Sequence, residues 1–301
     1  MSQTATTTAT ATLRSGAETL AASLPPLLAA AERLAQGVVP GVHGRRRAGS
    51  GETFWQYRQA MPGDSATSID WRRSARGDTL YIRQTEWEAA QSVLFWADPS
   101  AGMGFSSAGH APKSERARLL ALALGVLLTR AGERIGLLDT PLARPSAGRN
   151  QLGRFAATLA APLLADDISA LPGPGPVSAG HYVLISDFMM DETALRDGLN
   201  AMAARGTRGA LLQITDPAEE SFPFDGRVIF QSLAGSPAGA VSFETRRARA
   251  IKAAYQQRLA ARRDLLASWA HHAGWQFSAH RTDAAPSAAL LWLYAAIGGL
   301  T

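Results

Sequence analysis

The chain has 301 residues, enough for one large domain and a small module, and its 46% hydrophobic content supports a substantial core. Its net charge of +5, from 30 Lys and Arg against 25 Asp and Glu, permits an anionic partner without requiring nucleic acid. The absence of cysteine excludes disulfides, zinc–cysteine sites, iron–sulfur clusters and cysteine nucleophiles.

The N-terminal region predicts a tail followed by a helix. Residues 1–16 are rich in Thr, Ala and Ser, lack a signal-peptide core and are expected to be disordered. Apolar residues on one face then predict a helix over Leu20–Val38. The longest apolar runs, Leu119–Thr129 and Ala288–Leu300, fall short of the ~20 residues that a membrane span needs. We therefore expect a cytoplasmic protein with no direct membrane span.

Short strands and turns are predicted between Gly41 and Glu88. The strands are expected at Thr53–Arg58 and Thr79–Thr85, and the turns at Met61–Asp64 and Arg76–Asp78. With the preceding helix, this segment forms a predicted unit over residues 17–90.

Alternating strands and helices are predicted from residue 91 to residue 301. The expected strands are Ser92–Ala97, Arg134–Leu138, His181–Ser186, Gly209–Ile214 and Trp275–Ser278, with a short edge pair at Arg227–Gln231 and Ala240–Phe243. The expected helices are Lys113–Arg130, Asn150–Leu164, Asp191–Arg205, Arg246–His272 and Pro286–Ile297. This order predicts an α/β fold, a doubly wound and mostly parallel sheet covered on both faces. A membrane tail is the alternative for the last helix, but its length favours packing on the sheet.

Two aspartates follow predicted strands and suggest a metal site. Asp98 comes after Ser92–Ala97, and Asp187 comes after His181–Ser186. If these strands are central neighbours, their carboxylates converge at the edge where open α/β sheets bind ligands. Carboxylate and hydroxyl oxygens suit Mg²⁺, so Ser100 is a further candidate ligand.

Arginine, carboxylate and tryptophan are unusually dense between Val42 and Glu88. Six arginines have five nearby acidic residues, which predicts a partly buried ionic network walled by Trp55, Trp71 and Trp87. A docking surface for a partner protein or an anion is an alternative. Aromatic side chains among arginines also allow nucleic-acid binding, although the acidic residues weaken its electrostatic basis.

The same segment carries an ordered set of short motifs. They run from Gly41-Val42-His43-Gly44-Arg45-Arg46 through Ile69-Asp70-Trp71 to Tyr81-Ile82-Arg83. This set resembles the signature of the domain of unknown function 58 family, in which the segment accompanies a von Willebrand A-like domain. The matching side chains are His43, Arg45, Arg46, Glu52, Tyr57, Arg58, Asp64, Asp70, Trp71, Arg76, Arg83 and Glu86. The resemblance implies a bacterial, MoxR-associated protein that partners an AAA+ ATPase, and it implies no established catalytic activity.

The Asp98 loop resembles a metal-ion-dependent adhesion site, whose motif is Asp-x-Ser-x-Ser. Asp98 and Ser100 match its first two positions, Gly102 replaces the second serine, and Asp187 matches the late aspartate. Thr140 is the candidate for the threonine ligand, and Ser106 is the candidate that would supply the missing hydroxyl. The alternative is a degenerate site in which both aspartates accept backbone N–H groups and hold no metal.

The function predicted from these features is a non-enzymatic protein-interaction adaptor. It would work with a MoxR-type AAA+ ATPase in remodelling or maturing an unknown client, with Mg²⁺ as an optional cofactor and no organic cofactor. We identify no catalytic residue: the histidines are scattered and no hydrolase motif is present. A metal-dependent hydrolase using Asp98 and Asp187 is the enzymatic alternative, and nucleic-acid binding through the arginine-rich segment is a third.

Overall fold

The protein is described by a computed structural model. It covers residues 27–38, 48–61, 64–75, 77, 79–86, 90–164, 168, 170–177, 180–231 and 242–298. Two compact units are present: Val42–Gln91, and an α/β unit of Ser92–Leu300 that also takes in the N-terminal part of the chain. The predicted tail, Arg76 and Asp78 of the predicted turn, and the motif residues His43, Arg45 and Arg46 lie outside the described residues.

The α/β unit is built on a five-stranded parallel sheet with the order β4-β3-β5-β6-β9. Its strands are β3 (Ser92–Ala97), β4 (Arg134–Leu137), β5 (His181–Ser186), β6 (Arg208–Thr215) and β9 (Gln276–Arg281). The chain passes from β3 to β4 on one side and then returns to β5 on the other. The strand order therefore reverses between β3 and β5, which is where open α/β sheets place their ligands.

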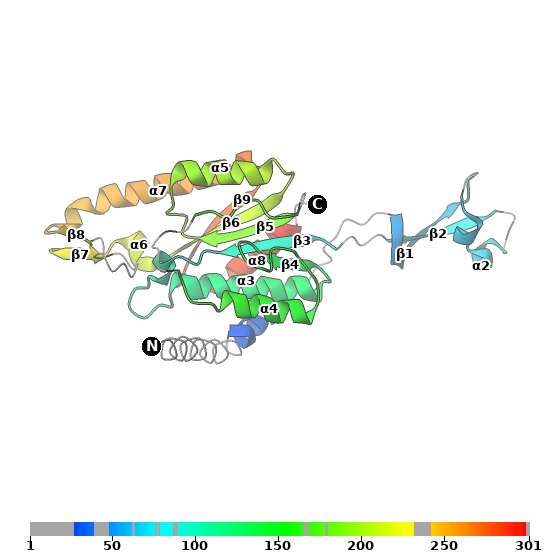
Figure 1. The fold of residues 1–301 in the computed structure, drawn as a ribbon, viewed down its shortest axis with the longest axis horizontal. Coiled ribbons are helices and arrows are strands. Elements are labelled where there is room, and N and C mark those ends of the chain that lie inside the picture. Colours follow the sequence, from blue (N-terminus) through cyan, green and yellow to red (C-terminus); the bar gives the residue numbers. More distant parts are fainter. Residues whose placement is uncertain are drawn as a thin grey trace, which may run out of the picture. The chain divides into compact units, whose positions relative to one another are not determined.

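Helices cover both faces of this sheet (Figure 1). One face packs against α3 (Lys113–Arg130), α4 (Arg149–Leu159) and α8 (Pro286–Gly298), and the helix at residues 27–36 lies on the side of α3 away from the sheet (Figure 1). The other face packs against α5 (Glu192–Ala203) and α7 (Ala248–His272). The predicted doubly wound α/β architecture, with a parallel sheet covered on both faces, is confirmed.

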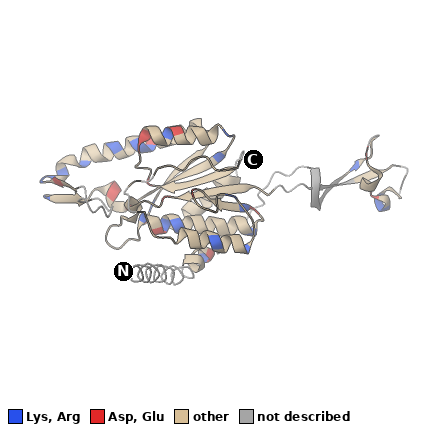
Figure 2. Cartoon of the chain, in the orientation of Figure 1, with Lys and Arg blue, Asp and Glu red and all other residues tan. Residues whose placement is uncertain are grey.

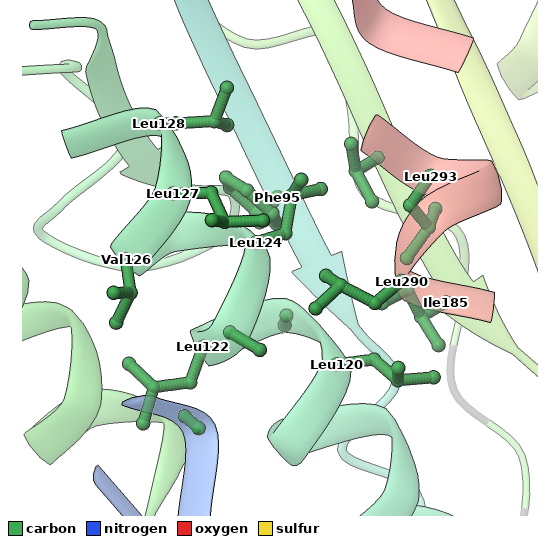
Figure 3. Close-up of a cluster of buried hydrophobic side chains, with 14 of the residues drawn as sticks. Phe95, Leu120, Leu122, Leu124, Val126, Leu127, Leu128, Ile185, Leu290 and Leu293 are labelled. Atoms are coloured by element: carbon green, nitrogen blue, oxygen red, sulfur yellow. The ribbon is translucent and has the colours of Figure 1, made fainter. Parts of the chain in front are cut away.

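Successive side chains of each strand point to opposite faces of the sheet, so each face has its own hydrophobic core. Phe95 and Ile185 face α3 and α8, as Figure 3 shows, whereas Leu94 and Leu184 face α5 and α7. Because the sheet is buried on both sides, its central strands β3 and β5 are largely apolar, and charged residues gather on the outer helices (Figure 2). The sheet is thus a rigid base for whatever its carboxyl edge carries.

Smaller elements follow β6. Helix α6 (Pro217–Ser221), which the sequence patterns did not predict, begins at the Asp216 N-cap. Strands β7 (Val228–Gln231) and β8 (Ser242–Thr245) pair antiparallel, so the predicted short pair is present, but it forms a separate two-stranded sheet and not an edge of the main sheet. Among the described residues, no helix combines the length and apolar character needed to cross a bilayer.

The small unit is a two-stranded antiparallel sheet with short helical turns. Strand β1 (Ala48–Gln59) pairs with β2 (Tyr81–Glu86), and between them lie the 3-10 turn η1 (Ala66–Ser68) and helix α2 (Trp71–Ser74). Asp70 accepts the Arg73 N–H at 3.0 Å and caps α2. Asp70 is therefore the N-cap of α2.

Two expected boundaries need correction. The N-terminal helix belongs to the α/β unit and not to the small unit, because Ala31, Ala35 and Val38 are buried in the core beside α3. Helix α4 ends at Leu159 and not at Leu164, since Pro162 disfavours helical backbone at the residue before it.

Two glycine substitutions should change stability in opposite directions. A Cβ at Gly209 would lie 2.5 Å from the Tyr182 carbonyl oxygen and 2.9 Å from the Trp275 ring. We expect Gly209→Ala to lower the free energy of unfolding by about 1–3 kcal/mol through overpacking. A Cβ at Gly153, in α4, would meet nothing within 4 Å. Gly153→Ala should therefore raise the free energy of unfolding by up to about 1 kcal/mol. Urea unfolding of both variants checks this, and a loss at both positions would contradict it.

Candidate functional site

The carboxyl edge of the sheet gathers the acidic residues predicted for the site. β3 and β5 are hydrogen-bonded neighbours with Ala97 opposite Ile185, so Asp98 and Asp187 emerge side by side where the strand order reverses. Asp98 is 4% exposed and Asp187 is 8% exposed. The strand ends that carry Asp98 and Asp187 are therefore neighbours, as the strand order required.

The Asp98 carboxylate is held by neutral donors on both oxygens. Its Oδ1 accepts the Ser100 backbone N–H at 2.9 Å, and its Oδ2 accepts the Ser186 hydroxyl at 2.5 Å. The Ser186 hydroxyl oxygen in turn accepts the Phe188 N–H at 2.9 Å. These bonds tie the end of β3 to the end of β5.

A buried lysine binds the Asp187 carboxylate. Lys113, the first residue of α3, is 2% exposed. Its Nζ lies 2.7 Å from Asp187 Oδ2 and 2.7 Å from Glu219 Oε1. Asp187 Oδ1 also accepts the Met189 N–H at 3.0 Å. The result is an ion triad that links α3, the end of β5 and α6.

Burial and mutual attraction act against each other in this triad. Burial alone would lower the pKa of Lys113, but the carboxylates of Asp187 and Glu219 raise it above its ordinary value. Burial raises the pKa of Glu219, and the nearby Lys113 ammonium opposes that rise. The lysine is therefore charged at neutral pH and supplies the positive charge of the site.

Helix α6 places Glu219 through a capping box. Asp216 Oδ1 accepts the Ala218 N–H at 2.8 Å, while Glu219 Oε2 accepts the Asp216 N–H at 2.7 Å. Asp216 Oδ2 also accepts the Ser107 N–H at 2.9 Å, which ties α6 to the loop after Asp98. The spacing of Asp216 and Glu219 is the signal that could have revealed this short helix.

The backbone after Asp187 is held in a strained conformation. Phe188 has a positive φ of 54° although it is not glycine. Arg262 of α7 donates from Nε to the Phe188 carbonyl at 2.9 Å and from Nη2 to the Met190 carbonyl at 2.5 Å. Gln213 Nε2 donates to the Asp187 carbonyl at 3.0 Å. These contacts fix the Asp187 loop, and such strain is common at functional sites.

The other predicted metal ligands are Ser100, Thr140 and Ser106, and each has a different position. Ser100 is buried beside Asp98 and starts the 3-10 turn η2 (Ala101–Gly104). Thr140 donates to the Leu137 carbonyl at 2.7 Å and accepts the Leu142 N–H at 3.1 Å, so its hydroxyl closes the turn after β4. Ser106 is exposed, and it is the N–H of its neighbour Ser107 that reaches the site.

The donor set does not fit a resident divalent ion at the predicted ligands. Both Asp98 oxygens hold neutral donors, Asp187 binds the Lys113 ammonium, and Gly102 provides no hydroxyl. Within the described part of the chain, no group of three or more His, Cys, Asp or Glu residues is arranged to hold a metal. The magnesium site stays a prediction, to be decided by a binding measurement.

A cavity lies beside the Asp98 loop, at the carboxyl ends of β3 and β4. Its volume is about 470 Å³, within the range of small-ligand and side-chain pockets. Trp96 and Leu138 supply apolar wall, and the exposed Leu164 and Ile168 also line it. Asp98 and Asp139 contribute carboxylates, and burial raises the pKa of Asp139.

The structure contains part of the ionic network that was predicted for the small unit. Arg58 makes a bidentate pair with Asp64, with N–O distances of 2.7 and 2.6 Å, and this lowers the pKa of Asp64 to about 2. Tyr57 donates its hydroxyl to Asp70 at 3.2 Å. Trp71 is exposed and does not wall these pairs. The side chains of Glu52, Arg83 and Glu86 lie outside the described residues.

Comparison with known proteins gives a match to one family model and similarity to solved structures. The family model described as "Protein of unknown function DUF58" matches residues 56–265. No curated protein matches the chain. Two of the solved structures that are similar each show 12% identity over 70% of this chain. They are the conserved hypothetical protein BatB from Bacteroides thetaiotaomicron, covered to 98% with a TM-score of 0.41, and an aerotolerance-related membrane protein from Bacteroides fragilis NCTC 9343, covered to 100% with a TM-score of 0.38.

Proposed function

The chain belongs to the DUF58 family of proteins of unknown function, and from this membership we propose that it is a non-enzymatic adaptor. It works with a MoxR-type AAA+ ATPase in remodelling or maturing a client protein. The proposed contact is the carboxyl edge of the sheet.

The observation that supports this proposal is that the acidic side chains at the carboxyl edge already have bonded partners. Asp98 is hydrogen-bonded on both oxygens, and Asp187 and Glu219 bind one lysine. A hydrolytic site needs a carboxylate or metal that can activate water, and usually an open coordination position. Groups locked in this way hold the loops in one geometry, which serves recognition better than proton transfer.

The cavity beside Asp98 suggests the chemistry of the docked segment. Its walls are apolar, and its polar groups include the carboxylates of Asp98 and Asp139. Arg118 also lines it, but that guanidinium donates to the Ala161 carbonyl at 2.6 Å. We propose that the ATPase inserts a segment with a basic side chain beside an apolar one, which matches both features.

A substitution at the cavity mouth tests this contact. Ile168, which is 56% exposed, lines the cavity. Ile168→Asp should weaken binding to the purified MoxR-type ATPase from the same genome by about tenfold or more, because it buries an unpaired carboxylate at the contact. Calorimetry or surface plasmon resonance measures this.

Ile229→Asp is the matched control, because Ile229 is 50% exposed and lies on β7 instead of at the cavity. Asp139→Asn should weaken binding as well, since it removes charge while asparagine tolerates the positive φ of 53° at that position. Equal affinities for all variants and the unmodified protein would rule out docking at this cavity. No binding by any of them would overturn the adaptor proposal.

A further inference from the structure

The carboxyl edge of the sheet already contains a cation, the ammonium group of Lys113. A divalent ion in an acidic crevice does two things: it neutralises the carboxylates and fixes their relative positions. Lys113 Nζ does both, since it contacts Asp187 and Glu219 at 2.7 Å each and joins three separate elements.

Three features indicate that position 113 is selected for this charge and not for helix stability. A cation in the first turn of a helix opposes the macrodipole, so it costs stability there. A buried ammonium needs compensating partners, and it has two carboxylates. Of the 30 Lys and Arg residues only Lys113 and Lys252 are lysine, so a chain that otherwise uses arginine has a compact point charge here.

We infer that the Lys113 ammonium is the resident cation of this site and takes the place of a divalent metal ion. The cation lies between the ends of β5 and β6, because Asp187 follows β5 and Glu219 lies on α6, directly after β6. Asp98, at the end of β3, accepts the Ser100 N–H and the Ser186 hydroxyl. The inference concerns the site alone and does not depend on the adaptor proposal.

The inference predicts that a metal site appears when the lysine is removed. Lys113→Ala leaves two carboxylate oxygens around the space that Nζ occupied, and Mg²⁺ and Mn²⁺ are held in proteins by one or two carboxylates with waters. Mn²⁺ should bind Lys113→Ala about tenfold or more tightly than the unmodified protein, and should raise the melting temperature of the variant only. Calorimetry and thermal unfolding measure these effects with the full chain and with Mn²⁺ or Mg²⁺ alone.

Lys252→Ala is the matched control, because it removes the other lysine, in α7. It should behave as the unmodified protein does. Should Lys113→Ala fail to fold without metal, recovery of its secondary structure on adding Mn²⁺ provides the same test, and failure to recover counts against the inference.

The unmodified protein gives an independent test. Stoichiometric Mg²⁺ or Mn²⁺ binding that is lost in Asp98→Asn would overturn the inference and establish the metal site predicted from the sequence. Equal and weak binding by the unmodified protein and Lys113→Ala would also overturn it. Neither result depends on whether the ATPase binds.

Discussion

Replacing Lys113 by methionine should lower the free energy of unfolding by about 3–5 kcal/mol at neutral pH. Methionine fills much of the same space, so the loss comes from charge and not from a cavity. Two carboxylates that each lay 2.7 Å from the ammonium would then be buried without their cation. Chemical denaturation followed by circular dichroism measures the change.

A neutral version of the whole triad separates charge from packing. Lys113→Met combined with Asp187→Asn and Glu219→Gln removes all three charges and should recover most of the lost stability. Lys252→Met removes the other lysine and should change stability by less than about 0.5 kcal/mol. Equal losses at positions 113 and 252 would show that the triad contributes nothing to the fold.

Acidification should destabilise the protein through one histidine, His280 of β9. This side chain is 7% exposed, and Arg116 Nη1 lies 2.8 Å from its Nε2. Burial, reinforced by the Arg116 charge and opposed by Asp283, lowers its pKa from 6.5 to about 4. Between these two values the unfolded chain binds a proton that the folded protein does not, so stability falls as the pH falls. The contribution is complete above pH 6.5, and its full loss amounts to at most about 3 kcal/mol.

Substituting His280 isolates this contribution from that of the carboxylates. His280→Gln keeps an acceptor for Arg116 but cannot take up a proton in this range. Between pH 6.5 and 5 the stability of this variant should therefore vary less with pH than that of the unmodified protein. Parallel curves for the two proteins over this interval would show that His280 does not titrate as its surroundings indicate.

The sequence predicts the elements whose signals are long and periodic. Strands β3 and β5 and helix α3 begin and end at the predicted residues, because uniform burial leaves each of them a nearly continuous apolar run. Helix α6 escaped prediction because it has only five residues and depends on its cap. The end of α4 was placed too late because apolar residues continue past the point where the backbone must leave the helix.

The candidate site could be predicted only in part, for a similar reason. Asp98 and Asp187 follow neighbouring strands, and this placement could be predicted because strand order can be argued from the alternation of elements. The contact between Lys113 and Glu219 spans 106 positions and depends on how α3 and α6 meet in three dimensions. The sequence places Lys113 at the start of a predicted helix, but spacing gives it no partner and no role.

The ion triad also determines how the protein would respond to its surroundings. A bound metal comes and goes with the supply of ions, so a metal-dependent contact varies with nutrient limitation and with chelators in the medium. A lysine is made with the chain, in a fixed ratio of one per molecule, and cannot be captured by a competing binder. A contact built on such a charge would be available as soon as folding is complete, in metal-starved and metal-rich cells alike.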